Sequence, residues 1–177
     1  MSYNEEYNNW KQNPYKFWES RANNIHWTKK WNSVLDQSNP PFWNWFSGAE
    51  LNTCYNCLDV HIENGNGDRN ALIYDSPVTN TKISYTYKNL LNKTSKIAGA
   101  LKEHGIKKGD RVLIYMPMVP EAVASMLACA RIGAIHVVVF GGFAPNELAT
   151  RIDDSKPKII IAGSCGIEPG KIIEYKP

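Results

Sequence analysis

From Ala71 onward, the apolar positions alternate between the spacing of strands and the spacing of helices. Two short runs, Ala71–Tyr74 and Lys82–Tyr85, flank a polar turn that contains proline, which is typical of a β-hairpin. Thr86 can cap a helix, and apolar residues recur every three to four positions across 90–101. Gly105 suits the position just after that helix. This part of the chain therefore predicts a hairpin followed by an amphipathic helix.

The next fifty residues repeat one strand and one helix in turn. Strands are predicted at 111–115, 135–140 and 157–162, and helices at 121–132 and 147–153. Pro120 occupies the first helical position, where its missing N–H is tolerated, and Gly133 stops that helix. The run 135–140 is apolar and β-branched, so we expect it to be buried on both faces. The order predicts an α/β fold, a βαβαβ parallel sheet with covering helices.

The first sixty residues have a different composition. All six tryptophans lie at or before Trp45, and the pattern indicates short helices and turns. We therefore place a mostly helical or irregular aromatic segment at 1–61 and the α/β domain at 62–177. Sixty residues cannot easily cover so much aromatic surface, so we expect this arm to pack on a larger protein. An aromatic platform for sugars or nucleic acids would need interleaved basic residues, and Lys29 and Lys30 are too few.

Charge and hydropathy exclude several classes of protein. The net charge of +3 is small and the basic residues are dispersed, which argues against nucleic-acid binding. No apolar run approaches the roughly 18 residues of a membrane helix. The start of the chain is acidic and shows neither a secretory signal nor a presequence, so we expect a cytoplasmic location.

Cysteine and histidine spacing gives no metal site. Cys54 and Cys57 form a lone C-x-x-C, and zinc would need a second ligand pair at a suitable distance. We interpret them as reduced, partly buried thiols. The four histidines are far apart in sequence, so we expect structural roles for them.

Two glycine-containing stretches follow predicted strands. The segment 164–171, SCGIEPGK, has two glycines and a lysine, but a Walker loop would need glycine at Cys165 and serine or threonine at Ile172. The other stretch is Phe140–Gly142. Since ligands gather beyond the carboxyl ends of parallel strands, we expect both stretches at one rim of the sheet, the first as a loop. From its glycines alone, the second is typical of a tight strand-to-loop turn.

Several long strings resemble the acetyl-CoA synthetase family of acyl-adenylate-forming enzymes. The resemblance runs from about Tyr15 to the end of the chain. Within the family, the sequence is most similar to the branch of the propionyl-CoA, or short-chain acyl-CoA, synthetases. The strings are NTCYNCLD at 52–59, GDRVLIYMPMVPE at 109–121, MLACARIGA at 126–134 and VFGGF at 139–143. The aromatic arm is similar to the segment that precedes the AMP-binding domain in these enzymes.

This resemblance implies a two-step ligation. A short-chain carboxylate, acetate or propionate, attacks ATP to give an acyl adenylate and diphosphate, and CoA then displaces AMP. The resemblance also assigns CoA binding to seven residues: Phe140, Gly141, Gly142, Glu168, Pro169, Gly170 and Lys171. Glycines would let adenine approach the backbone, and Lys171 would act as a point charge on a phosphate. Acetate-specific enzymes carry arginine where Glu168 stands, and a carboxylate there should repel phosphate.

The family's other functional motifs do not occur in this chain. They comprise the Ser/Thr/Gly-rich loop and lysine for the ATP phosphates, the adenine and ribose contacts, and the catalytic lysine. We therefore expect the first quarter of the enzyme, with no catalytic residue, and with ATP and Mg bound elsewhere in the full protein. The alternatives are a module that keeps weak affinity for CoA or nucleotide, and an interaction protein that docks on a full-length homologue. Self-association through the aromatic arm is also expected.

Overall fold

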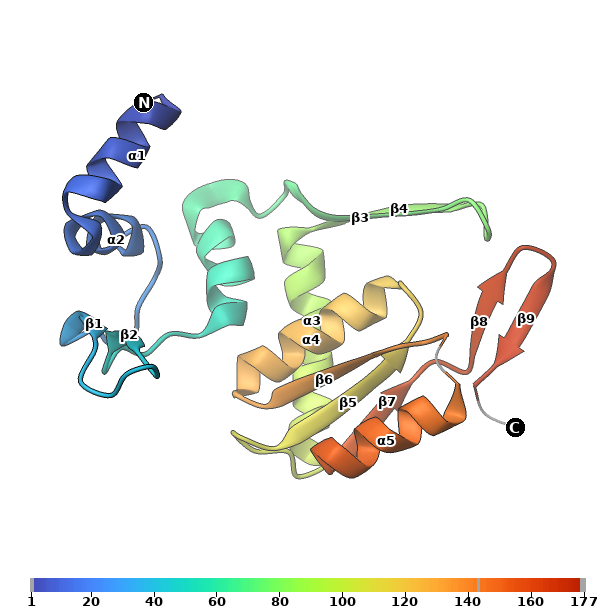
Figure 1. Cartoon of the computed structure of the whole chain (residues 1–177). Coiled ribbons are helices and arrows are strands. Elements are labelled where there is room, and N and C mark those ends of the chain that lie inside the picture. Colours follow the sequence, from blue (N-terminus) through green and yellow to red (C-terminus); the bar gives the residue numbers. More distant parts are fainter. Residues whose placement is uncertain (1, 143, 176–177) are drawn as a thin grey trace. The chain divides into compact units, whose positions relative to one another are not determined.

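The computed structural model describes residues 2–142 and 144–175 (Figure 1). The chain forms two compact units, Met1–Asn52 and Thr53–Pro177, which are described separately. Within the described part, every helix is too short or too polar to traverse a bilayer.

The first unit begins with two capped helices. Helix α1 (Tyr3–Gln12) starts with a capping box, in which the Ser2 hydroxyl accepts from the Glu5 N–H and the Glu5 carboxylate accepts from the Ser2 N–H. Helix α2 (Pro14–Ala22) has proline at its first position, and the Asn13 side chain caps it. Both helices agree with the sequence prediction of short helices.

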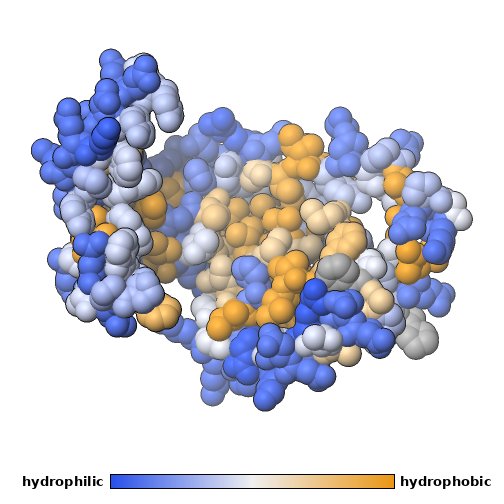
Figure 2. All heavy atoms as spheres, in the orientation of Figure 1, coloured by the Kyte–Doolittle hydropathy of each residue, from blue (hydrophilic) through white to orange (hydrophobic). Residues whose placement is uncertain are grey.

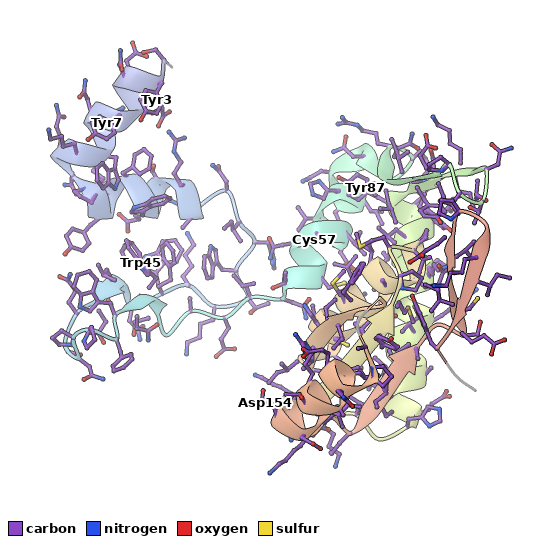
Figure 3. The ribbon with its side chains drawn as sticks, turned by 45° about the vertical axis from the view of Figure 1, so that its right-hand side comes forward. Tyr3, Tyr7, Trp45, Cys57, Tyr87 and Asp154 are labelled. Atoms are coloured by element: carbon purple, nitrogen blue, oxygen red, sulfur yellow. The ribbon has the colours of Figure 1, made fainter. Side chains whose placement is uncertain are left out.

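The first unit also contains an antiparallel hairpin, which the sequence did not predict. Strand β1 (Ser33–Asp36) pairs with β2 (Asn44–Ser47). Trp45 of β2 lies edge-on to Trp18 of α2, with 6.2 Å between the ring centroids, and its side chain points toward that helix in Figure 3. Aromatic packing therefore joins the hairpin to the helices, although Phe42 and Trp43 stay exposed.

The second unit opens with a helical stretch that contains two π-helical segments, η1 (Tyr55–Asp59) and η2 (Ile62–Asn66). The predicted hairpin is present as β3 (Asn70–Ser76) and β4 (Thr81–Thr86). Helix α3 (Tyr87–Glu103) follows at once, because the Thr86 hydroxyl accepts from the Asn89 N–H at 3.2 Å. Gly105 has a φ of +80°, as expected after a helix end.

A three-stranded parallel sheet forms the centre of this unit, in the order β6–β5–β7. Its elements are β5 (Arg111–Met116), α4 (Pro120–Ile132), β6 (Ile135–Phe140), α5 (Pro145–Ser155) and β7 (Ile159–Ala162). Helices α3 and α4 pack on the face that includes Val112, while α5 packs on the face of Leu113 and Tyr115 (Figure 1). The predicted α/β fold is confirmed.

Two details of the prediction are wrong. Strand β6 is not buried on both faces, because it is an edge strand, and Ile135, Val138 and Phe140 are more than half exposed. Figure 2 shows apolar side chains gathered on the surface over this strand. Second, the stretch 164–171 is not a single loop, as was expected. It belongs to an antiparallel hairpin of β8 (Cys165–Glu168) and β9 (Lys171–Glu174).

Candidate functional site

The candidate site lies where the neighbouring strands β5 and β6 end. Met116 and Phe140 are paired in register, so the segments after them, Pro117–Met118 and Gly141–Gly142, leave the same edge of the sheet. A turn follows β5 at once, since the Val119 N–H donates to the Pro117 carbonyl at 2.8 Å. This edge is the usual place for ligands in parallel α/β sheets.

The β8–β9 hairpin supplies the other wall of the site. Its strands are joined by Pro169 and Gly170, and Gly170 has a φ of +71°. Proline followed by a glycine with positive φ is typical of a type II turn. Glu168 and Lys171 face each other in the register across this turn, and both are exposed.

These segments enclose a cavity of about 250 Å³. The cavity brings together four residues that the sequence assigned to CoA: Phe140, Gly141, Gly142 and Glu168. The other three, Pro169, Gly170 and Lys171, do not line it and lie at the tip of the hairpin. Six described residues that the sequence did not assign to CoA also line the cavity: Pro117, Met118, Gly166, Ile167, Ile173 and Tyr175.

Glycine is required at the rim because neighbouring atoms approach the backbone closely. A Cβ at Gly141 would lie 2.6 Å from the Tyr175 hydroxyl and 2.8 Å from the Met116 carbonyl carbon. A Cβ at Gly142 would lie 2.7 Å from the Phe140 ring. Real Cβ contacts are longer than this, so Gly141 needs glycine because backbone atoms are in the way, whereas a Cβ at Gly142 would require the exposed Phe140 ring to shift.

The chemistry of the lining suits a flat apolar group better than a phosphate. Phe140, Tyr175 and Ile173 give aromatic and aliphatic walls, and the charged group in the lining is the Glu168 carboxylate. Burial is the main cause that raises the pKa of Tyr175, so its hydroxyl is neutral at physiological pH. No lysine or arginine is among the described residues that line the cavity. A phosphate would therefore meet repulsion here, whereas a nucleobase would meet ring faces.

No metal centre accompanies this cavity in the described residues, where no three His, Cys, Asp or Glu side chains are grouped to hold an ion. A second cavity, of about 380 Å³, lies between the 53–58 segment, β3, α3 and α4, and its lining is largely apolar. Tyr87 and Cys57, which line it, are labelled in Figure 3.

The C-x-x-C segment is attached to α4 by a charged pair. Arg131 donates two hydrogen bonds to the Asp59 carboxylate, at 2.8 and 3.1 Å, and its Nη1 lies 3.7 Å from the Cys54 Sγ. Cys54 is buried, Cys57 is exposed, and both are free thiols. Burial raises the pKa of Cys54, which keeps it a thiol. Both cysteines are free thiols as expected, but the prediction that both are partly buried is wrong, because Cys54 is fully buried and Cys57 is exposed. The Arg131–Asp59 pair gives this segment a structural role.

The sequence contained signals for some of the residues that it missed. Pro117 and Met118 follow the carboxyl end of a predicted strand, which is reason enough to include them. Pro169-Gly170 between two apolar runs is a turn signal that predicts the hairpin, and with it the inward position of Ile173. No sequence pattern near Tyr175 predicts that it lines the cavity, because its position depends on a tertiary contact with Gly141.

Comparison with known proteins gives a consistent result over both units. A family model described as "AMP-binding enzyme" matches residues 60–174, and one described as "Acetyl-coenzyme A synthetase N-terminus" matches residues 3–57. The chain is 57% identical over 164 residues to "Acyl-CoA synthetase short-chain family member 3, mitochondrial" of Bos taurus, which covers 93% of this chain and 24% of the relative. It is 48% identical over 161 residues to "Acetyl-coenzyme A synthetase" of Streptomyces coelicolor, which covers 91% of this chain and 25% of the relative. The chain thus spans about a quarter of the length of these relatives.

Proposed function

Because the chain belongs to the AMP-binding enzyme family, we propose that it forms the N-terminal part of a short-chain acyl-CoA synthetase. In the proposed reaction, acetate or propionate and ATP give an acyl adenylate and diphosphate, and the CoA thiol then displaces AMP. The similarity to a short-chain family member and to an acetyl-CoA synthetase supports this substrate class.

The observation that carries the proposal is the cavity at the ends of β5 and β6. It joins Phe140–Gly142 with Glu168 in a mostly apolar lining, which supports the binding of a base rather than of phosphates. We propose that the adenine of CoA enters this cavity beside the exposed Phe140 ring. The phosphates would then lie outside it, within reach of Lys171 at the hairpin tip.

The chemical steps belong to other parts of the proposed enzyme. Stabilising the transition state at the α-phosphate of ATP needs cationic groups aimed at it, and the described residues of the cavity lining include none. We therefore propose that this chain contributes to CoA binding, while ATP and Mg are held elsewhere. On its own, the chain should release no diphosphate from ATP with acetate or propionate in the presence of CoA.

A chimera tests the proposed activity. We would join this chain to the remainder of the Bos taurus relative, replacing the segment that it matches, and measure acyl-CoA formation. The chimera should convert both acids, whereas the 177-residue chain alone should equal a blank without protein. A folded chimera that leaves both acids unreacted would contradict the proposal.

Two variants of the chimera test the cavity. Phe140→Ala should raise the KM for CoA by roughly tenfold, a loss of about 1.4 kcal/mol in binding, and leave the KM for ATP unchanged. Ile73→Ala is the matched control, because Ile73 is similarly exposed on β3 and does not line the cavity. Equal KM values for CoA in the two variants would argue that CoA binds elsewhere.

The cellular location remains a prediction. The Bos taurus and Homo sapiens relatives are mitochondrial by name, whereas the start of this chain led us to expect the cytoplasm. Fractionation of cells that carry the tagged native gene would decide between the two compartments.

A further inference from the structure

Tyr175 connects three parts of the second unit through one side chain. It directly follows β9, and its backbone N–H donates to the Ser164 carbonyl at 3.0 Å, which fixes it at the base of the hairpin. Its ring packs on Tyr115 of β5, with 4.8 Å between the centroids and 41° between the planes. The ring therefore lies between the hairpin and the central strand of the sheet.

The hydroxyl of Tyr175 occupies a notch made by two glycines. A Cβ at Gly141 would lie 2.6 Å from this oxygen, and a Cβ at Gly166 would lie 2.5 Å from it. These distances are too short for real contacts, so the hydroxyl fits only because both positions lack a side chain. Gly141 follows β6 and Gly166 is in β8, so the same hydroxyl touches both walls of the cavity.

The ring of Tyr175 is also part of the cavity lining, together with Phe140 and Ile173. Because the hydroxyl end is inserted between the two glycines, the ring cannot swing away without leaving that notch. A shorter side chain would open space between β8 and the end of β6, and the cavity would become larger on that side.

We infer that Tyr175 is a positioning and specificity residue: it holds the β8–β9 hairpin against the end of β6 and sets the size of the base that the cavity accepts. The role in docking the hairpin stands on the contacts alone. The role in specificity rests on the proposed function, in which the adenine of CoA occupies this cavity.

A double-mutant cycle on the 177-residue chain tests whether the Tyr175 hydroxyl occupies the notch, on which the docking role depends. Gly166→Ala should lower the urea midpoint clearly in the wild-type chain, because the new Cβ meets the hydroxyl at 2.5 Å. In a Tyr175→Phe background the nearest ring atom is Cζ at 3.1 Å, so the same substitution should lower the midpoint by less than half as much. Gly163→Ala is the control, since its Cβ would lie 3.9 Å from the Tyr175 ring and its effect should be the same in both backgrounds. Gly141→Ala reports on the contact with the end of β6, because its Cβ would lie 2.6 Å from the same hydroxyl, and it should also lose less in the Tyr175→Phe background. Equal losses for Gly141→Ala in both backgrounds would overturn the docking role.

A ligand comparison tests the specificity role. Calorimetry would measure the Kd of CoA and of 1,N6-etheno-CoA, whose base is larger, for wild type, Tyr175→Phe and Tyr175→Leu. Tyr175→Leu should shift the preference toward the larger base by roughly fivefold, whereas Tyr175→Phe should keep the wild-type preference. A purely structural role would weaken both ligands in proportion, and an unchanged ratio in Tyr175→Leu would therefore overturn the specificity role. If the wild-type chain binds neither ligand, CoA binding by this chain fails and specificity fails with it, while the double-mutant cycle still decides the docking role.

Discussion

Two regions of the second unit are built in opposite ways. One is helix α4 together with the segment that contains Asp59, and the other is the ends of β5 and β6 together with the β8–β9 hairpin. In the first region, Arg131 binds Asp59 through two hydrogen bonds, and Cys54 and Cys129 are fully buried. In the second, glycines and a tyrosine hydroxyl leave a cavity open between neighbouring segments. The first region is closed by charge pairing and close packing, and the second is kept open by missing side chains.

Both regions contain strings by which the sequence resembles its family, yet their residues are needed for different physical reasons. A substitution in the closed region removes a partner from a buried group, so its effect should appear in the free energy of unfolding. A substitution in the open region changes the size or charge of a cavity, so its effect should appear in ligand binding as well. The predictions below separate these two cases, in order of decreasing effect.

The largest effect is expected from Arg131→Ala. The Asp59 carboxylate, whose side chain is 15% exposed, would lose its bidentate partner. We expect a loss of about 3 kcal/mol in the free energy of unfolding, the lower end for a buried pair because Arg131 itself reaches solvent. Urea unfolding followed by circular dichroism measures it. Arg151→Ala, which removes an exposed pair with Glu147, is the control and should cost under about 0.5 kcal/mol.

A smaller loss is expected from Gly141→Ala. The new methyl group would meet both the Tyr175 hydroxyl and backbone atoms of Met116 and Pro117, which cannot move away easily. We expect a loss of about 2 kcal/mol, typical of overpacking. Gly99→Ala is the matched control, because no atom lies within 4 Å of its Cβ position on α3, and it should stabilise the chain by about 0.5–1 kcal/mol. An unchanged free energy of unfolding in Gly141→Ala would show that the backbone at the ends of β5 and β6 shifts to accept the methyl group.

Alkaline pH should weaken the closed region through Cys129. Burial raises the pKa of its thiol from 9.0 to about 11. Between these values the unfolded chain releases the proton and the folded chain keeps it, so stability falls as pH rises, by about 1.4 kcal/mol at pH 10. The wild type should lose this amount relative to Cys129→Ala between pH 8 and 10. Cys57→Ala, at an exposed thiol, should follow the wild type, and parallel curves for all three would contradict the assignment.

The smallest effect is expected from Lys171→Ala. Lys171 is exposed at the hairpin tip and does not line the cavity, so it can add only a screened attraction for a CoA phosphate. The Kd for CoA should rise by about threefold at low salt and by less at high salt, as for an exposed charge pair. Calorimetry at two salt concentrations measures it, with Lys82→Ala on β4 as the control. A salt-independent loss would place Lys171 in direct, buried contact with the ligand.

The sequence predicted the second unit well because its signals are local. Thr86 marks a helix end by its side-chain hydroxyl, and Gly105, Pro120 and Gly133 do so by their backbone conformation. Each lies where expected. The gathering of Phe140–Gly142 and Glu168 at one cavity was likewise foreseeable, since both stretches follow strands of one parallel sheet. The role of these residues in CoA binding stays a prediction.

The sequence predictions failed where a residue's environment depends on which strands and segments lie next to each other in the fold. The β-branched run 135–140 predicts a strand, but only the strand order β6–β5–β7 makes it an edge strand that is partly exposed. The stretch 164–171 was expected to be a loop, yet Cys165–Glu168 pairs with Lys171–Glu174 in a hairpin. Tyr175 was missed because its contacts with Gly141 and Gly166 come from parts of the chain that spacing does not relate.

The distribution of aromatic residues also gives each unit its own optical signal. All six tryptophans belong to Met1–Asn52, and Trp27 and Trp31 pack against Phe46 in that unit. Selective tryptophan excitation therefore reports on the first unit alone, whereas far-ultraviolet ellipticity is dominated by the longer helices α3 and α4 of the second. Recording both signals in one denaturant titration would show whether the two units lose their structure in a single transition or one after the other.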